Sequence, residues 1–164
     1  MSLLYKVGIL TLSDKGARGE RIDESGPAIK NILTDEYEVI MYKVIPDDFE
    51  LIKSELIAMC EAGCNLVLTT GGTGFSKRDV TPEATLAVAT RNAPGIAEAI
   101  RANSLKITDR AMLSRAASVI RNDTIIINLP GSPKAVKESL DFILPTLKHG
   151  LDILLGRDGE CARK

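Results

Sequence analysis

The stretch LVLTTGGTGFSKRDVTPEAT, residues 66–85, decides the fold class. An apolar run ends in two threonines, and three glycines follow within four positions. A basic pair, an aspartate and Thr81-Pro82 come next, and the last pair predicts a helix with Thr81 as its N-cap. A buried strand that passes through a glycine loop into a helix indicates an α/β protein.

The segments on both sides of this stretch alternate between strand and helix patterns. A single domain over residues 1–164 is expected, with a loose tail at 156–164. The alternation predicts a three-layer α/β/α sandwich with a mostly parallel central sheet. Strands are expected at 6–14, 37–45, 65–70 and, around an Asn122-Asp123 turn, within 118–130. Helices are expected from an N-cap at Ser25, over 49–60, over 82–91, from about 94, around 110–116 and from Pro133 onward.

Composition excludes several classes of function. The 164 residues match the length of one domain, and a net charge of −1 gives no field that would attract nucleic acid. Aromatic residues make up 4% and tryptophan is absent, which argues against a base-stacking surface. No segment resembles a signal peptide or reaches the length of a membrane span. Three cysteines, with Cys60 and Cys64 expected in a helix, favour a reducing compartment, so a soluble cytoplasmic protein is expected.

Four loops are expected to meet at one edge of the sheet. In open α/β folds, ligands bind outside the carboxyl ends of the strands. That rule brings together Ser13-Asp14, Pro46-Asp47, Gly71–Asp79 and Leu129–Pro133. The candidate site is therefore predicted to consist of these four segments.

Two of these loops are rich in glycine and proline. Because the turn at 71–74 largely lacks Cβ atoms, its backbone N–H groups can approach an anion, and phosphate is the natural candidate. The turn in NLPGSPKAV, residues 128–136, also joins an apolar strand to a helix, whose N-terminus favours anions. Neither turn matches the P-loop or the dinucleotide-binding fingerprint. The alternative is that both turns serve only chain connectivity.

Asp47 and Asp79 are the candidate acids of this edge. Each lies just beyond a strand, and magnesium usually takes one or two carboxylates plus substrate phosphates. The alternative roles are a helix N-cap for the first acid and a solvated loop charge for the second. The single histidine, His149, excludes multi-histidine metal sites and argues against a Ser-His triad. The residues alone predict a phosphate- or nucleotide-binding α/β domain, with magnesium as a candidate cofactor.

The segment LTTGGTGFSKRDVTPEAT, residues 68–85, closely resembles the signature of the molybdopterin adenylyltransferase family of MogA/MoaB type, which includes the N-terminal domain of gephyrin. The resemblance covers nearly the whole chain in the expected order. It extends to GILTLSDKGARGERIDESGPAI (8–29), VIPDD (44–48), AMLSRAASVI (111–120) and NLPGSPKAVKESLDFILPTLKHGL (128–151).

The resemblance implies magnesium-dependent transfer of AMP from ATP to the terminal phosphate of molybdopterin, with release of pyrophosphate. It also implies a homotrimer or a dimer of trimers, and hand-over of the product to a molybdate-inserting protein. It implies that Asp47 and Asp79 are the important acids, and our hypothesis is that these two catalytic residues hold magnesium on the ATP phosphates. Substrate or nucleotide contacts are implied at both turns and at three further positions, namely Ser13, Asp14, Gly71, Gly72, Thr73, Gly74, Ser114, Pro130, Gly131 and Ser132.

Two other functions remain open on the sequence. One is a non-catalytic pterin-binding or trimeric scaffold protein, although a pure binder has less use for the pair Asp47 and Asp79. The other is a different nucleotide-processing enzyme on the same fold, such as the related domain of competence-damage proteins. The full match at RDVTPEAT, residues 78–85, argues against that second alternative.

Overall fold

The computed structural model describes residues 3–157 of the chain, and within them the strands form one six-stranded sheet. The order across the sheet is β2-β1-β3-β6-β5-β4. The first four strands in this order pair in parallel, whereas β5 and β4 complete one edge in antiparallel fashion. The strands are β1 Tyr5–Leu12, β2 Tyr37–Ile45, β3 Leu66–Thr70, β4 Arg91–Asn92, β5 Ser118–Arg121 and β6 Thr124–Leu129.

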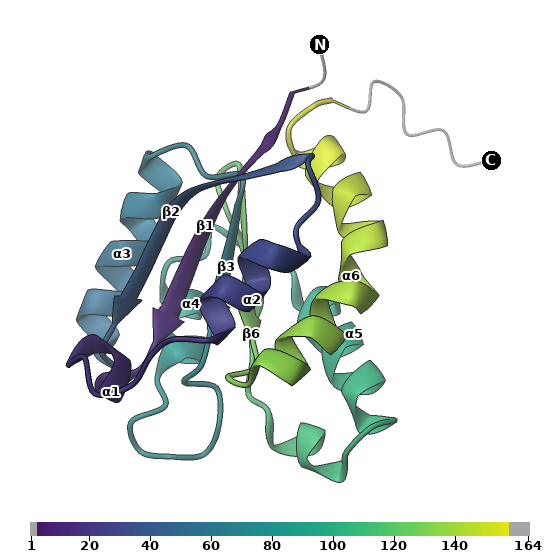
Figure 1. Ribbon diagram of the computed structural model, residues 1–164. Coiled ribbons are helices and arrows are strands. Elements are labelled where there is room, and N and C mark those ends of the chain that lie inside the picture. Colours follow the sequence, from purple (N-terminus) through teal and green to yellow (C-terminus); the bar gives the residue numbers. More distant parts are fainter. Residues whose placement is uncertain (1–2, 158–164) are drawn as a thin grey trace.

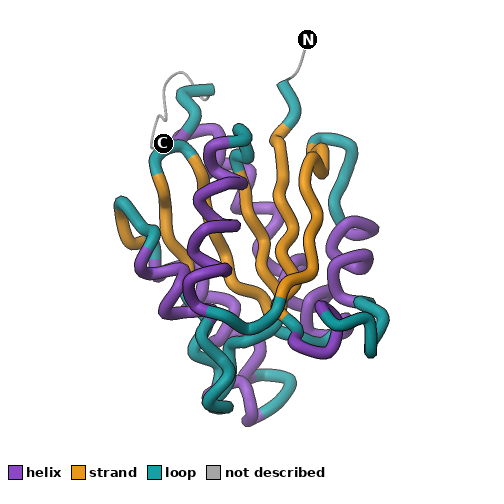
Figure 2. Tube along the Cα trace, turned by 90° about the vertical axis from the view of Figure 1, so that its left-hand side faces the viewer, coloured by secondary structure: helices purple, strands orange, loops and turns teal. Residues whose placement is uncertain are grey.

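Helices cover both faces of the sheet, which confirms the predicted three-layer sandwich (Figures 1 and 2). One face packs against α2, α5 and α6, and the opposite face packs against α3 and α4. The helices are α1 Asp14–Ala17, α2 Ser25–Ile32, α3 Phe49–Glu61, α4 Thr81–Ala87, α5 Pro94–Leu105, the 3-10 helix η1 Asp109–Leu113 and α6 Pro133–Leu154. In the part of the chain described here, no helix is both long enough and apolar enough to cross a membrane.

The burial of β3 explains why the sequences of the central strands are continuous apolar runs. Leu66 and Leu68 join the core beneath α6, whereas Val67 joins the core beneath α3. Because successive side chains point to opposite faces and both faces are covered by helices, every residue of β3 is buried. The strand is thereby fixed in register, and so is the glycine loop that follows it.

The two predicted N-caps are wrong. Ser25 and Thr81 are the first residues of α2 and α4, and neither helix has a side-chain cap. Their hydroxyls bond elsewhere: Ser25 Oγ donates to the carbonyl of Gly131 (2.7 Å), and Thr81 Oγ1 donates to the carbonyl of Gly71 (3.1 Å). Both side chains tie a helix start to a glycine turn, which local sequence patterns do not reveal.

Two helix boundaries also differ from the prediction. The helix expected over 82–91 ends at Ala87, and Arg91 instead pairs with Ile120 as part of β4. The helix expected around 110–116 is only the short 3-10 helix η1. The chain leaves η1 because the backbone N–H of Arg115 bonds to the carbonyl of Thr73 (2.9 Å) rather than within a helix.

The C-terminal helix α6 runs from Pro133 to Leu154 and includes Pro145. It packs its buried residues against the sheet, as its predicted period requires. The tail expected at 156–164 falls, from residue 158 onward, outside the described residues.

Candidate active site

The two glycine turns lie against each other at the carboxyl edge of the sheet. Gly71 has φ +94°, and a Cβ there would stand 2.6 Å from the carbonyl oxygen of Leu12. A Cβ on Gly131 would stand 3.6 Å from Cα of Gly71. Thr70 Oγ1 donates to the carbonyl of Pro130 (2.6 Å) and holds the two turns together. The sequence-based grouping of these loops at one edge is therefore correct.

Gly72 brings the backbone of the first turn next to Asp47, an acid in the loop that follows β2. Its φ is +69°, a conformation that suits glycine. A Cβ at this position would stand 2.3 Å from Thr81 Oγ1 and 2.9 Å from Asp47 Oδ1. The absence of a side chain thus allows the loop and the carboxylate to lie together.

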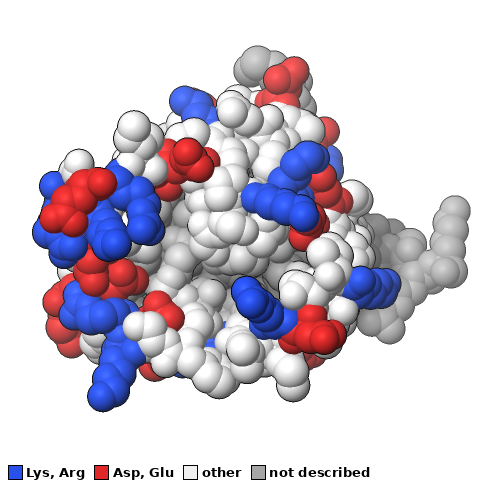
Figure 3. All heavy atoms as spheres, turned by 60° about the horizontal axis from the view of Figure 1, so that its bottom comes forward, with Lys and Arg blue, Asp and Glu red and all other residues white. Residues whose placement is uncertain are grey.

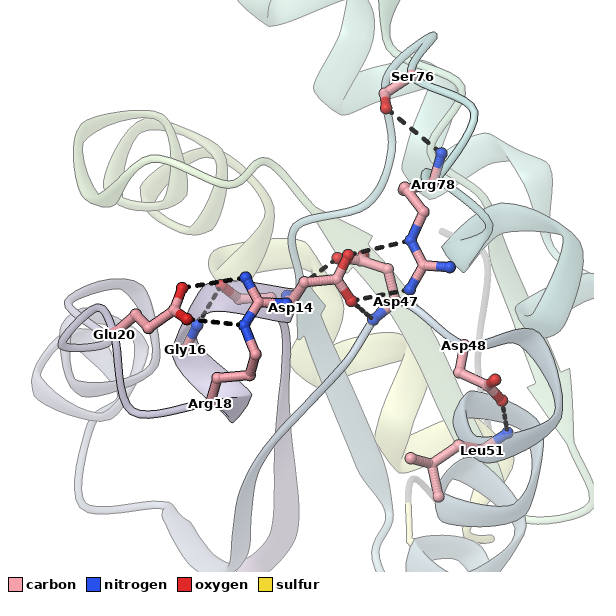
Figure 4. A network of polar contacts seen from close by, with 10 residues as sticks. Asp14, Gly16, Arg18, Glu20, Asp47, Asp48, Leu51, Ser76 and Arg78 are labelled. Carbon is pink, nitrogen blue, oxygen red and sulfur yellow. Dashed lines mark hydrogen bonds and ion pairs between the residues drawn. The ribbon is translucent and has the colours of Figure 1, made fainter.

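Asp14 and Asp47 are joined by two hydrogen bonds, each from the backbone N–H of one residue to the carboxylate of the other. The N–H of Asp47 donates to Asp14 Oδ1 (2.9 Å), and the N–H of Asp14 donates to Asp47 Oδ2 (3.3 Å). Arg78 reaches across from the loop after β3 and grips Asp14 with two bonds of 3.0 and 2.9 Å (Figure 4). One network thus joins the ends of β1, β2 and β3.

The two carboxylates of this pair have different electrostatic surroundings. The Arg78 guanidinium, followed by the Asp47 backbone bond, lowers the pKa of Asp14 from 3.8 to about 2. Burial raises the pKa of Asp47, and the charge of Asp14 raises it further. Asp47 Oδ1 is buried and has no hydrogen-bond partner within the described residues. Such an oxygen is available to a cation or to a hydrogen-bond donor of a ligand.

Asp79 lies on the same loop as Arg78 and is partly buried. Its Oδ2 accepts from the backbone N–H of Ser76 (3.1 Å), and its charge is among those that raise the pKa of Asp47. No three or more His, Cys, Asp or Glu side chains converge on one metal position between residues 3 and 157. Two carboxylates fit magnesium that is shared with substrate phosphates, because that ion keeps few protein ligands.

Two cavities open on either side of the Pro130-Gly131 turn. The larger, of about 740 Å³, falls within the size range of small-molecule sites. The smaller measures about 220 Å³. Gly131 lines both cavities. The arrangement offers two adjoining spaces at one sheet edge.

The predicted site residues divide among these spaces. Ser13, Gly71 and Gly131 line the larger cavity, whereas Thr73, Ser114, Pro130 and Gly131 line the smaller one. Asp14, Asp47 and Asp79 line neither cavity; Asp47 lies beside Gly72, and Asp79 lies beside Gly74. Ser132 lines neither cavity as well.

Three predicted serines have local structural bonds. Ser13 Oγ accepts from the N–H of Gly16 (3.0 Å) and caps α1, while Ser132 Oγ accepts from the N–H of Ala135 (3.2 Å) and caps α6. Ser114 Oγ accepts from the N–H of Ala116 (3.3 Å). Each hydroxyl therefore shapes a loop of the site.

Sequence reasoning missed Asp23 in the larger cavity. Asp23 accepts from Thr11 Oγ1 (2.8 Å) and from the hydroxyl of Tyr42, and it also accepts from the N–H groups of Ser25 and Gly26. An aspartate two residues before a serine at a helix start was the available signal. Arg115 was missed too, because its partners are backbone carbonyls far away in the sequence.

Charged side chains surround the hollow at this end of the molecule (Figure 3). Exposed arginines contribute, with Arg18 paired to Glu20 (3.0 Å) and Arg21 lining the larger cavity. Cations at the rim attract anionic ligands even where the net charge of the chain is near zero.

The fold and the site define a class: α/β proteins that bind phosphate-bearing ligands at the carboxyl edge of a mostly parallel sheet. The chain belongs to the family described as "Probable molybdopterin binding domain", which matches residues 8–149. The molybdopterin adenylyltransferase of Helicobacter pylori (strain J99) is 43% identical over 155 residues, 92% of this chain and 88% of the relative.

Solved structures agree with the family. The molybdopterin biosynthesis enzyme MoaB of Thermus thermophilus superposes with a TM-score of 0.88 at 46% identity, over 93% of this chain and 98% of that one. The tungsten cofactor synthesizing protein MoaB of Pyrococcus furiosus has a TM-score of 0.83 at 34% identity, over 94% and 98% of the two chains. The resemblance inferred from sequence motifs is confirmed.

Proposed function

We infer that this protein is a molybdopterin adenylyltransferase. It transfers the AMP moiety of ATP to the terminal phosphate of molybdopterin and yields adenylyl-molybdopterin and pyrophosphate. The relative from Helicobacter pylori, at 43% identity over 92% of this chain, supports the activity. The observation in the structure that carries it is the buried Oδ1 of Asp47, which lies beside Gly72 at an edge with two adjoining cavities and has no hydrogen-bond partner among residues 3–157.

The chemistry requires positioning more than acid–base catalysis. A phosphate oxygen of molybdopterin forms a bond to the α-phosphorus of ATP, and the bond from that phosphorus to the bridging oxygen of pyrophosphate breaks. The attacking phosphate is already anionic at neutral pH, so no side chain has to remove a proton. The backbone turns at Gly71–Gly74 and Gly131 can orient phosphate groups through N–H donors.

Magnesium is proposed as the cofactor, held by Asp47 and Asp79. When bound, it supplies neutralisation of the charge on the ATP phosphates. Asp47 offers the oxygen without a partner, and Asp79 offers a second carboxylate from the opposing loop. Both provide the hard oxygen ligands that magnesium prefers. Asp14, held by Arg78, is proposed to orient Asp47.

The test measures pyrophosphate release from ATP in the presence of magnesium, with and without molybdopterin. We expect release that requires molybdopterin and that falls at least about 100-fold in Asp79→Asn. Asp123→Asn is the matched control, since Asp123 is exposed in the β5–β6 turn at the other end of the sheet. Absence of release from folded protein that binds molybdopterin would instead indicate a pterin-binding protein.

A homotrimer, or a dimer of trimers, is proposed as the assembly. An apolar depression of about 610 Å³ between α5 and α6 is lined by residues that include Pro94, Ile96 and Phe142. Phe142 is 46% exposed, and apolar hollows of this kind favour association with another copy. Sedimentation of the wild type should give a multiple of three chains, and Phe142→Glu should shift the mass towards one chain. A wild type that sediments as one chain would exclude this assembly.

The product is proposed to pass to a molybdate-inserting protein in the cytoplasm. Cys60 and Cys64 are both free thiols, which suits a reducing compartment. The new phosphoanhydride is an activated bond, so a protein that consumes it by inserting molybdate is the expected next step. Purified product offered with molybdate to such a protein should release AMP, and product that is not consumed would contradict the hand-over.

A further inference from the structure

The loop between β3 and α4 carries Asp79, and its tip is held by the bond from the N–H of Ser76 to Asp79 Oδ2 and by the bonds from Arg78 to Asp14. At its base, Thr81 bonds to the carbonyls of Gly71 and Gly72 through its hydroxyl and its N–H (3.1 and 3.2 Å). At its tip, the N–H of Asp79 donates to the carbonyl of Ser76 (3.0 Å). Residues 75–78 are exposed. None of these bonds joins the outgoing limb of the loop at Thr73-Gly74 to the returning limb at Asp79, so the spacing of the two limbs depends on a further contact.

Arg115 supplies this contact between the two limbs through three hydrogen bonds. Its backbone N–H donates to the carbonyl of Thr73 (2.9 Å), and its Nε donates to the carbonyl of Gly74 (2.8 Å). Its Nη2 donates to the carbonyl of Asp79 (2.8 Å) on the returning limb. The planar guanidinium presents several donors in a fixed fork, so one side chain spans both limbs.

Glu83 orients the guanidinium. Its two carboxylate oxygens accept from Nη1 of Arg115 (2.9 and 2.8 Å). Glu83 lies in the first turn of α4, and it does not contact the loop carbonyls that Arg115 holds. The guanidinium of Arg115 thus bonds to Glu83 of α4 on one side and to carbonyls of the loop on the other.

We propose that Arg115 is the positioning residue that holds Asp79 opposite Asp47. It contacts the backbone of Asp79 rather than its carboxylate, so it acts through the geometry of the loop. The inference rests on the proposed adenylyl transfer, in which both acids serve one magnesium ion. A lysine cannot replace the arginine, because a single ammonium group cannot donate to carbonyls of both limbs in this fixed arrangement.

The first readout needs no substrate or metal. Hydrogen exchange followed by NMR should show the amides of Ser76 and Asp79 exchanging about tenfold faster in Arg115→Met and Arg115→Lys than in the wild type. Unchanged protection in β3 would show that both variants are folded. The lysine variant keeps the charge and the stem, and it provides the answer if the methionine variant does not fold.

The second readout is activity against magnesium concentration. Both Arg115 variants should lose about 100-fold in kcat and need more magnesium for half-maximal rate. Glu83→Gln keeps one oxygen that can accept from Nη1 and leaves the loop bonds in place, so its loss in kcat should be smaller than that of either Arg115 variant.

Three outcomes would overturn the proposal: unchanged exchange at Ser76 and Asp79, rescue by Arg115→Lys, or a loss in Glu83→Gln equal to that in Arg115→Met. An inactive wild type would refute the adenylyl transfer instead, because the exchange readout on the loop does not depend on it.

Discussion

The backbone N–H groups of Asp14 and Asp47 each donate to the carboxylate of the other residue, yet the pKa values of the two carboxyls are shifted in opposite directions from their ordinary value. Arg78 lowers the pKa of Asp14 to about 2, while burial raises that of Asp47. Arg78 bonds to both oxygens of Asp14, whereas one oxygen of Asp47 is buried and has no hydrogen-bond partner in the described part of the chain. Asp14 is therefore stabilised in its ionised form, whereas the ionised form of Asp47 is disfavoured by the fold.

Replacing Asp47 by asparagine should raise stability and remove activity. A carboxyl whose folded pKa is raised contributes stability that is present below its unfolded pKa and lost as the pH rises through the folded pKa. At neutral pH the ionised form is therefore unfavourable in the fold, and Asp47→Asn relieves its repulsion with Asp14. Because Asp47 is only partly buried, the gain should be less than about 1 kcal/mol.

Denaturant unfolding at several pH values checks this. The gain of Asp47→Asn over the wild type should shrink as the pH falls below the pKa of Asp47, while pyrophosphate release drops at least about 100-fold throughout. Asp48→Ala is the neighbouring comparison, since Asp48 caps α3 by accepting from Leu51 (2.8 Å) and should cost stability when changed. An Asp47→Asn protein less stable than the wild type at neutral pH would refute this account of the pair.

Removing the Arg78 guanidinium should change how the free energy of unfolding depends on pH in the acid range. A carboxyl whose folded pKa is depressed contributes stability that is present above its unfolded pKa and lost as the pH falls through the folded pKa. For Asp14 that window runs from 3.8 down to about 2. In Arg78→Met the pKa of Asp14 should move back towards 3.8, so this contribution shrinks to the part that comes from the N–H of Asp47.

An NMR titration of the Asp14 carboxyl measures the shift directly. Arg18→Met is the control, because Arg18 pairs with Glu20 and acts on Asp14 only as the smallest of its influences. That variant should raise the pKa of Glu20 and leave Asp14 nearly unchanged. Equal shifts of Asp14 in both variants would mean that general charge, not the two-bond grip, sets its pKa.

Gly72→Ala should be more damaging than its backbone angle alone explains. The alanine would be strained at φ +69°, and its Cβ would stand 2.3 Å from Thr81 Oγ1. Gly19 has a similar φ of +75° but nothing within 4 Å of the same position. Gly19→Ala should therefore cost about 1 kcal/mol from strain, whereas Gly72→Ala should cost about 3 kcal/mol and displace Asp47.

Thermal unfolding of the two glycine variants, measured side by side, separates strain from contact. Activity should survive in Gly19→Ala and be lost in Gly72→Ala. Similar losses of stability in both would show that the contact with Thr81 and Asp47 relaxes without cost.

The layer order and the five longer strands could be predicted from sequence because they follow from periodicity, whereas the two-residue strand β4 was expected as the end of a helix. The run at 37–45 matches β2 residue for residue, since alternation and the flanking Pro46 mark its limits. The carboxyl-edge rule then placed Asp47 near Gly72 without any knowledge of distances.

The sequence did not reveal where the hydroxyls of Ser25 and Thr81 or the guanidinium of Arg115 find their partners. Ser25 and Thr81 look like caps, but tertiary contacts offered their hydroxyls the carbonyls of Gly131 and Gly71. Arg115 lies in a segment with a helical pattern, yet its bonds to Thr73 and Gly74 draw the chain out of the helix. Such bonds join residues far apart in the sequence, so local patterns carry no trace of them.

Asn128 provides a last test, because its buried side chain links β6 to β3, to α4 and to the segment before β5. Its side chain is fully buried, its Nδ2 donates to Thr69 Oγ1 (3.0 Å) and Thr85 Oγ1 (2.9 Å), and its Oδ1 accepts from the N–H of Ala117 (3.0 Å). Asn128→Leu should cost about 3 kcal/mol, since it leaves buried polar partners unsatisfied.

Asn128→Asp makes the test depend on pH. Burial should raise the pKa of a carboxyl at this position. Its contribution to the free energy of unfolding is therefore present below about pH 4, the pKa of the unfolded state, and is lost as the pH rises through the folded pKa. Denaturant unfolding should show this variant recovering towards the wild type in acid, whereas Asn128→Leu stays weakened at every pH. A loss in Asn128→Asp that does not change with pH would mean that Thr69 and Thr85 turn their hydroxyls to donate to the new carboxylate and stabilise it.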